Sequence, residues 1–341
     1  MSMNVTATTR RAFVRLALGT AVAGPLAASA GCSVLNGSSG STSSGGTSAA
    51  GLEKSKITIG VLQSIGSTPA RLAEKAGYFA KQGLEVTLKS YAASQQPVTL
   101  LQSGEIDFAV TNYVSFFQGV AQKTLDAKIV VDSNTANETS EALMAKPEAG
   151  ILTPRDLVGK RVAIHQAGST VELMLRATLK DNDVDPNSVH YVPVTFPNMP
   201  AAIASGQIDA GTEVEPYLTL GEQKQGLQPV LKIVSGSTAN MPITGYIAMS
   251  KFIDEHPKTV AAFQRAMIPA QADSADRAKL SDVLPEMAGV DKATAALLNL
   301  DTFPTSLNPT QMQRIITLMQ NYGGLSVPLD ATKYIVPTPK V

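Results

Sequence analysis

Residues 98–108 read VTLLQSGEIDF, and residues 200–210 read PAAIASGQIDA. Each segment predicts the end of an apolar helix, a Ser-Gly stop, a polar residue, and an Ile-Asp pair that opens a strand. Gly104 and Gly206 stand where the end of a helix requires a positive φ, which glycine adopts without steric cost. Because the two copies are about a domain's width apart, we expect two similar α/β lobes with a ligand-binding cleft between them.

The N-terminal residues have the pattern of an export signal. Thr9–Arg15 reads TRRAFVR, a twin-arginine pattern, and an apolar run follows from Leu16 to about Ala30. This run is too short and too rich in alanine and glycine to indicate a membrane span. Residues 28–32 then read ASAGC, which resembles a bacterial lipobox with Ser29 at the place where leucine is preferred. Residues 1–31 are therefore expected to be a twin-arginine export signal of the lipoprotein type.

Cys32 is the only cysteine of the chain, so it has no partner for an internal disulfide. Its place at the end of the signal favours lipidation, and two acyl chains would hold the protein on a membrane. An inert cysteine in the leader is the alternative. Residues 32–55 contain few apolar residues and include GSSGSTSSGG at 37–46, which predicts a flexible tether. We therefore expect an extracytoplasmic protein that is anchored to the cell membrane.

The chain has no excess of basic residues of the kind that binds nucleic acid. The whole sequence has 28 basic and 28 acidic residues, and without the signal 25 basic residues face 28 acidic ones, a net charge of −3. The remaining body, about 285 residues long, is sufficient for two lobes rather than one. We expect it to act as a monomer on a small molecule, without nucleic acid.

Strands that alternate with helices along the body predict mainly parallel sheets of the α/β class. The expected strands are 57–62, 84–88, 107–111, 128–132, 161–164, 190–194 and 209–213, with a return of the chain through 243–250. A helix is expected from Pro69 to about residue 82, and a largely helical tail, including 258–278, 291–298 and 309–322, is expected to complete or brace the first lobe. Residues 56–147 and 247–341 are assigned to lobe I, and 148–246 to lobe II. These boundaries place the crossovers between the lobes near 146–152 and 242–250.

Ligands of open α/β sheets bind beyond the carboxyl ends of the strands. Three loops have this position, and the start of the following helix gives each of them unpaired N–H groups and about half a positive charge. These loops suit a small anion or a polar head group, although Thr68 and Ser169 could simply cap helices. The residues expected to bind the ligand are Ser64, Ser67, Thr68, Thr111, Asn112, His165, Gly168, Ser169, Thr170, Glu213 and Thr244.

Glu213 enters this set through the repeat, because aligning Asp107 with Asp209 places it opposite Thr111. Glu213 and Glu215 alternate along an extended segment, so their side chains point to opposite sides and one of them could face the cleft. A carboxylate there would repel an anion but accept hydrogen bonds from an amine or amidine. A solvated or capping glutamate is the alternative for each.

Other chemistries have little support in the sequence. The three histidines show no close metal-ligand spacing, and His165 either lines the cleft or packs as an ordinary histidine. The sequence contains no nucleophile elbow, Walker loop or dinucleotide fingerprint. It also has no tryptophan, so an aromatic ligand would have to stack on tyrosine or phenylalanine, and most of these rings are expected in the core. We predict no catalytic residue, metal or cofactor.

Several segments of the body resemble the extracytoplasmic substrate-binding proteins of ABC importers, in the group for nitrate, sulfonate, taurine and thiamine-pyrimidine ligands. Residues 76–86 read AGYFAKQGLEV, similar to the helix end and Gly-Leu-x-Val strand of that group, and 157–163 read LVGKRVA, similar to the start of its second lobe. SGQIDA at 205–210, followed by EPY at 215–217, is similar to a third segment. Val214 departs from the pattern, because many members have tryptophan there.

The resemblance implies a periplasmic binding protein of the type II-like fold, whose two lobes close on a small polar or anionic solute such as a sulfonate, nitrate or taurine. It also implies docking on ABC permease subunits. Because the superfamily includes a pyrimidine synthase and a desulfinase, an enzyme is one alternative, although the desulfinase uses a cysteine nucleophile that the folded body lacks. A receptor that signals without transport is the other alternative.

Overall fold

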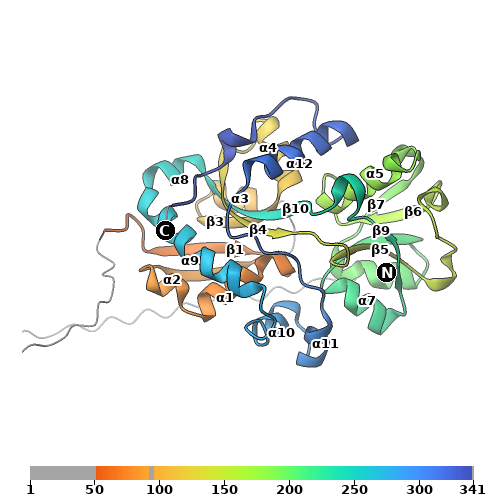
Figure 1. Ribbon diagram of the computed structural model, residues 1–341, viewed down its shortest axis with the longest axis horizontal. Helices are drawn as coiled ribbons and strands as arrows, with labels where there is room; N and C mark the ends of the chain where they lie inside the picture. The colour runs from red at the N-terminus through yellow and green to blue at the C-terminus, as the bar shows by residue number, and fades with distance from the viewer. Residues whose placement is uncertain (1–50, 92–95, 340–341) are drawn as a thin grey trace, which may run out of the picture. The chain divides into compact units, whose positions relative to one another are not determined.

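The computed structural model describes residues 51–91 and 96–339, which form two five-stranded sheets (Figure 1). The first sheet has the strand order β2-β1-β3-β10-β4, and the second has β7-β6-β8-β5-β9. In each sheet the first three strands are parallel, and the fourth runs antiparallel to both of its neighbours. The predicted fold class, two similar α/β halves with mixed, mainly parallel sheets, is therefore confirmed.

The strands of the two sheets have the following bounds. The first sheet consists of β1 (Lys56–Val61), β2 (Glu85–Ser90), β3 (Phe108–Asn112), β4 (Ala127–Thr135) and β10 (Pro242–Met249). The second consists of β5 (Glu141–Ala145), β6 (Arg161–Ile164), β7 (His190–Pro193), β8 (Ala210–Val214) and β9 (Gln228–Lys232).

The chain passes between the sheets earlier than the sequence-based boundaries place it. Strand β5 belongs to the second sheet although 56–147 was assigned to lobe I, and all of β10 belongs to the first sheet although lobe II was expected to reach 246. The crossovers therefore lie between β4 and β5 and between β9 and β10. The sequence pattern did not identify β5 because all five of its residues are buried, so apolar and polar positions do not alternate along it.

Helices cover both sheets. The first sheet is accompanied by α1 (Thr68–Lys75), α2 (Tyr78–Lys81), α3 (Gln96–Gln102), α4 (Tyr113–Ala121), α8 (Ser250–Glu255) and α9 (Pro257–Ser274). The second is accompanied by α5 (Thr170–Asp181), α6 (Met199–Ala204) and α7 (Tyr217–Gln225). The C-terminal part adds α10 (Val283–Ala288), α11 (Lys292–Leu297) and α12 (Pro309–Tyr322). None of these described helices is both long and apolar enough to span a membrane.

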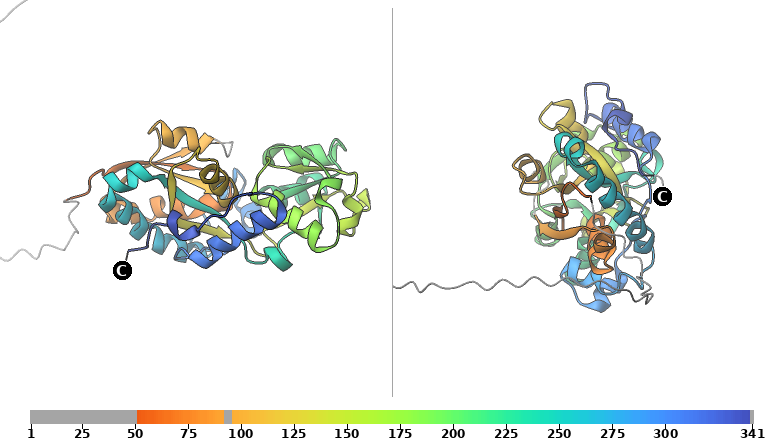
Figure 2. Two further views of the ribbon diagram at one scale, coloured as in Figure 1. Left: turned by 90° about the horizontal axis from the view of Figure 1, so that it is seen from above. Right: turned by 90° about the vertical axis from the view of Figure 1, so that its left-hand side faces the viewer.

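Helix α12 ties the two halves together, and Figure 2 shows it extending from the helices of the first sheet toward α5. It packs on α4 and α5, which belong to different halves. At its end, Tyr322 donates a hydrogen bond to Asp181 at 2.7 Å. Near its middle, Arg314 donates to the carbonyls of Ser237 and Ala239 at 2.7 and 2.8 Å. The predicted C-terminal helix at 309–322 therefore braces both halves rather than the first alone.

The repeated Ile-Asp pair has the same role in both sheets. The Asp107 carboxylate accepts a hydrogen bond from the N–H of Thr58 at 2.9 Å, and the Asp209 carboxylate accepts one from the N–H of Arg161 at 2.8 Å. Each aspartate N–H donates back to the carbonyl of the same partner residue. Because a buried backbone donor is costly to leave unpaired, each aspartate fixes the point where two parallel strands begin to pair.

The glycines of the repeat confirm the predicted backbone. Gly104 has φ +73° and Gly206 has φ +78°, directly after α3 and α6. The similarity of the two segments therefore reflects one supersecondary unit, helix, glycine stop and strand, that occurs once in each sheet.

Replacing Asp107 with alanine is expected to destabilise the protein by about 1–2 kcal/mol, because the N–H of Thr58 loses its partner. The same change also removes the ion pair with Lys54, whose Nζ lies 2.7 Å from the carboxylate. Thermal unfolding checks this, with Asp254→Ala as the control, since Asp254 is exposed. Equal melting temperatures for the two variants would contradict this role.

Three predictions about element ends need correction or lie outside the described residues. The tether was expected to reach residue 55, but the Glu53 carboxylate accepts hydrogen bonds from the N–H groups of Lys258 at 3.2 Å and Thr259 at 3.0 Å, so this part of the chain is held on α9. Gly77 (φ +70°) divides the expected helix into α1 and α2. The export signal, Ser29 and Cys32 lie outside the described residues.

Candidate functional site

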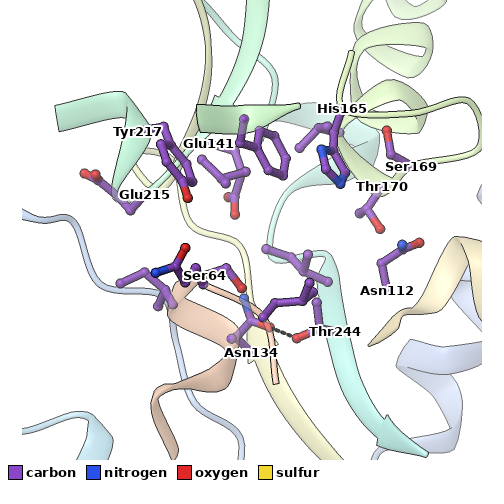
Figure 3. Close-up of a pocket in the computed structure, with 18 of the residues that line it drawn as sticks. Ser64, Asn112, Asn134, Glu141, His165, Ser169, Thr170, Glu215, Tyr217 and Thr244 are labelled. Carbon is purple, nitrogen blue, oxygen red and sulfur yellow. Dashed lines mark hydrogen bonds between the residues drawn. The ribbon is translucent and has the colours of Figure 1, made fainter. Parts of the chain in front are cut away.

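A cavity of about 380 Å³ lies between the two sheets, at the carboxyl ends of their parallel strands (Figure 3). From the first sheet it is lined by Leu62–Gly66 after β1 and by Asn112 at the end of β3. From the second it is lined by His165 after β6 and by Val214 and Glu215 at β8. This is the position at which the sequence analysis expected a ligand, and both halves contribute to it.

The first wall is organised by a chain of hydrogen bonds. Thr244 on β10 donates its hydroxyl to the side-chain carbonyl of Asn134 on β4. The Asn134 amide in turn donates to Asp301 Oδ2 at 2.6 Å. Asp301 belongs to the segment between α11 and α12, and the adjacent Thr302 bridges to Thr135 of β4. The chain of bonds holds these side chains in fixed orientations at the cavity.

Gly66 leaves the space that this network needs. A Cβ atom at this position would lie 2.5 Å from Thr244 Oγ1 and 2.8 Å from Asn134 Oδ1. Real Cβ atoms do not approach polar atoms that closely, so a side chain here would displace the network. The loop between β1 and α1 therefore has glycine for close packing, and its φ is not in the left-handed region.

The second wall carries an aromatic shelf of His165, Phe196 and Tyr217. The His165 and Phe196 rings are stacked, with centroids 4.3 Å apart and an interplanar angle of 6°. The Phe196 and Tyr217 rings are 6.1 Å apart at 14°. Burial lowers the pKa of His165, which favours its neutral form. The His165 and Phe196 rings therefore cover each other's faces, and the shelf presents an uncharged aromatic surface to the cavity, which suits an apolar group.

Three carboxyl groups line the cavity, those of Glu141, Glu215 and Asp301. Glu141 is 2% exposed and Asp301 is 9% exposed. Burial raises the pKa of Glu141 well above its usual range, and the nearby carboxyl groups of Asp301 and Glu215 raise it further. Burial also raises the pKa of Asp301 to about 6, against the opposing effect of the polar side chains of Ser140 and Asn134. The raised pKa of Glu141 favours its neutral form, so the negative charge of this cluster develops only as its carboxyl groups ionise.

Glu215 accepts more hydrogen bonds from the protein than the other two carboxyl groups do. It accepts from the N–H and the side-chain amide of Asn299, both at 2.9 Å, and from the Thr219 hydroxyl at 2.8 Å. In Figure 3 its carboxylate points away from the middle of the cavity, whereas that of Glu141 points into it. Glu215 thereby links β8 to the segment after α11.

Six of the residues expected to bind a ligand line this cavity, namely Ser64, Asn112, His165, Ser169, Thr170 and Thr244. Asn112 and Ser169 also cap helices, because their side-chain oxygens accept from the N–H groups of Ser115 at 2.8 Å and Glu172 at 3.3 Å. The Thr170 hydroxyl is buried and has no hydrogen-bond partner among the described residues. In Figure 3 the Thr170 side chain faces the cavity.

The other five expected residues do not line the cavity. Ser67 Oγ accepts from the N–H of Leu62 at 2.9 Å, and Thr68 is buried as the first residue of α1 rather than as its N-cap. Thr111 is buried within β3, where only the following Asn112 reaches the cavity. These corrections share one cause: along an extended strand or a tight turn, neighbouring side chains point to different sides.

The remaining two corrections concern the second half. Gly168 lines a separate cavity of about 740 Å³ between α5 and the end of α12, together with Gln118 and Arg176. Glu213 is 0% exposed inside the second half, and it is Glu215 that reaches the cavity between the sheets. The alternation of the two glutamates was predicted correctly, but the wrong one was chosen.

Sequence reasoning missed Asn134, Glu141, Phe196 and Asp301. Asp301 had a usable signal, because it is an isolated acidic residue in the apolar segment LLNLDTF. Glu141 had none, since it opens the strand that the periodicity did not reveal. Among the described residues, no group of three or more His, Cys, Asp or Glu side chains is placed to hold a metal ion.

The chain is similar in sequence to a periplasmic binding protein and to an enzyme. The chain is 27% identical over 216 residues to the "Taurine-binding periplasmic protein" of Escherichia coli (strain K12), a match that covers 63% of this chain and 66% of that protein, just under two thirds of its length. It is also 24% identical over 219 residues to a "4-amino-5-hydroxymethyl-2-methylpyrimidine phosphate synthase" of Schizosaccharomyces pombe (strain 972 / ATCC 24843), covering 60% of this chain and 61% of that protein.

Solved structures show the same fold. A "Ligand Binding Component of ABC-type Import System from Staphylococcus aureus with Zinc bound" superposes with a TM-score of 0.72 and 18% identity, covering 83% of this chain and 97% of that one. The sequence profile described as "NMT1/THI5 like" matches residues 65–276, which include most of both sheets and both walls of the cavity. The chain therefore belongs to the NMT1/THI5-like family.

Proposed function

We propose that the chain is the substrate-binding protein of an ABC importer and that it captures a small polar solute in the cavity between the two sheets. The observation that carries this proposal is the composition of the cavity wall, to which the carboxyl ends of strands from both sheets contribute. A solute held there contacts both halves at once, so it stabilises the closed arrangement. The likeness to a taurine-binding periplasmic protein and to the ligand-binding component of an ABC-type importer supports the same function.

Thermal unfolding with a panel of taurine, ethanesulfonate, nitrate and 4-aminopyrimidine tests the capture of a solute. A ligand at a hundredfold excess over its Kd stabilises the protein by about 2.7 kcal/mol, which raises the Tm by several degrees. Thr170→Val should remove most of that shift, because it replaces the buried hydroxyl with a methyl group of the same shape.

The matched control is Thr87→Val, since Thr87 is exposed on β2, away from the cavity. A shift that survives Thr170→Val unchanged would place the ligand elsewhere. Recovery of the bound probe for mass spectrometry separates capture from turnover: an unchanged probe is expected, and a converted one would favour the enzyme alternative.

We also propose that the protein is exported by the twin-arginine route and anchored through a lipid on Cys32, so that it acts as a monomer beside the permease subunits. The proposal rests on the TRRAFVR and ASAGC segments. Cys32→Ala in a host that processes lipoproteins should shift the protein from the membrane fraction to the soluble fraction. An unchanged distribution between the two fractions would contradict the lipid anchor. The alternative function, signalling without transport, would require partners other than a permease.

A further inference from the structure

The charge of the cavity is unusual for a site that holds an anion. Glu141 and Asp301 face it as buried carboxyl groups, and Glu215 adds a third one beside them. Within the part of the chain that the structure describes, no lysine or arginine lines the cavity. A sulfonate or nitrate would therefore meet no side-chain cation in the described lining, and an ionised Asp301 would repel it in a region of low dielectric.

Arg71 is the one cation among the described residues that donates a hydrogen bond to a residue of the cavity wall. Its guanidinium donates to Ser90 Oγ at 3.4 Å, and Ser90 lies at the cavity. This long contact leaves Arg71 outside the wall. An anion would be held by the N–H groups at the starts of the helices, or it would draw Arg71 inward. In the second case, Arg71→Gln weakens the binding of an anion but not that of a cation.

One acceptor in the cavity is left over by the hydrogen bonds of the protein. Asn134 donates to Asp301 Oδ2, while Asp301 Oδ1 is buried and has no hydrogen-bond partner among the described residues. A buried unpaired carboxylate oxygen is costly, and a ligand N–H donor would satisfy it. Asp301 is more than nine-tenths buried, so water does not replace such a donor freely.

We propose that the solute is an organic cation with a planar, N–H-rich head group of the amidinium or guanidinium type, held by the carboxylates of Glu141 and Asp301. This inference rests on the proposed function and names the ligand class of the same cavity. The head group lies between the two carboxylates, because a planar set of N–H donors matches the acceptor geometry of carboxylates. The flat body of the solute packs on the aromatic shelf of His165, Phe196 and Tyr217.

Three probes that share a benzene ring and differ in their head groups test which ligand charge the cavity prefers. Benzamidine carries the cation, benzamide is its neutral counterpart, and benzenesulfonate carries the anion. Titration calorimetry at pH 7.5 and fixed ionic strength should give benzamidine at least a tenfold lower Kd than either of the others. Equal or tighter binding of benzenesulfonate, or no binding of benzamidine, would overturn the inference.

Two isosteric variants, Asp301→Asn and Glu141→Gln, should each weaken benzamidine binding at least tenfold. The control is Glu286→Gln, which removes the same charge from an exposed position on α10 and should leave the Kd unchanged. Unfolding curves without ligand identify any variant that fails to fold, and the pH series of the unaltered protein then provides the same test without a substitution. Wild-type benzamidine affinity in both variants would contradict the assignment.

The pH series measures the Kd of benzamidine while the carboxyl groups of Glu141 and Asp301 change their protonation. The titratable groups that line the cavity are Tyr91, Glu141, His165, Glu215, Tyr217 and Asp301. Since the pKa of Asp301 is raised to about 6, this carboxyl group loses its proton between pH 5.5 and pH 7.5, whereas burial raises the pKa of Glu141 well above its usual value and a bound cation would favour its ionised form. Benzamidine affinity should therefore increase severalfold from pH 5.5 to pH 7.5. A flat or falling affinity would count against the pair.

The failure of this inference and the failure of the proposed function give different results. If taurine, nitrate or benzenesulfonate binds more tightly than benzamidine and Thr170→Val abolishes that binding, then the cavity captures a solute but the solute is not the proposed cation. If no probe of either panel binds, the proposed capture of a polar solute is itself contradicted. Binding of benzamidine that withstands Arg71→Gln and fails in Asp301→Asn supports both.

Discussion

Glu213→Gln is expected to stabilise the protein at pH 8 by at least about 2 kcal/mol and to leave its stability at pH 5 nearly unchanged. Glu213 is 0% exposed, and burial raises its pKa well above the usual value of 4.5, with a further rise from the charge of Glu215. In the unfolded chain the same carboxyl group ionises near pH 4.5. The folded protein holds the proton longer, so each pH unit above that value costs about 1.4 kcal/mol of stability until the folded group ionises.

Glutamine has nearly the same shape and carries no proton that can be lost in this range, so the variant removes that cost. Unfolding in urea at pH 5, 6.5 and 8 measures the difference between the two proteins. Asp132, with a pKa raised by burial to about 7, titrates in both and cancels from the comparison. A difference that does not grow with pH would show that Glu213 is ionised in the fold or already paired.

Phe196→Ala is expected to lower the affinity for an aromatic solute at least tenfold, because it removes the middle ring of the shelf. The His165 and Tyr217 rings would each lose a stacked neighbour, and the ligand would lose an apolar contact worth about 1–3 kcal/mol. Phe196 lies in a short helical turn that precedes α6 and contacts the cavity, so the fold should survive the change.

The measurement is the Kd of benzamidine by calorimetry, together with that of acetamidine, which carries the same cationic head group without a ring. Only the aromatic probe should lose affinity in Phe196→Ala. Phe252→Ala is a suitable control, because Phe252 stacks on His256 in the first half and lies outside the cavity. An equal loss for both cations would indicate a general disruption of the site rather than a loss of stacking.

The fold could be predicted in detail from the sequence where its patterns are local. The repeated helix, glycine and Ile-Asp unit indicated two similar sheets, and the strands at 161–164 and 190–194 were found within a residue of their observed ends. The sequence patterns did not predict strands β5 and β9. Strand β5 is buried along its whole length, so its partners in the second sheet are fixed by long-range pairing that a local pattern does not contain.

The cavity could be predicted only in part, for the same reason. Loops after strands could be located from the sequence, and this gave Ser64, His165 and Thr170. Asn134 and Glu141 lie close together in the sequence, on β4 and β5, and the distant Asp301 joins them through the bridge between Thr135 and Thr302. Their meeting determines the charge of the cavity, so the sequence left an anion, a polar head group and an amine or amidine open, whereas the assembled side chains led to the proposal of a cation.

Hydrogen exchange with and without a bound solute tests the central claim most directly. The solute of either panel that raises the Tm most should slow exchange in residues 64–67 and 165–171 together, since these segments form opposite walls of the cavity. Slower exchange in both segments is the predicted result. Protection confined to one of them, or to α5 and the end of α12 around the second cavity, would contradict the account that the two sheets grip one solute between them.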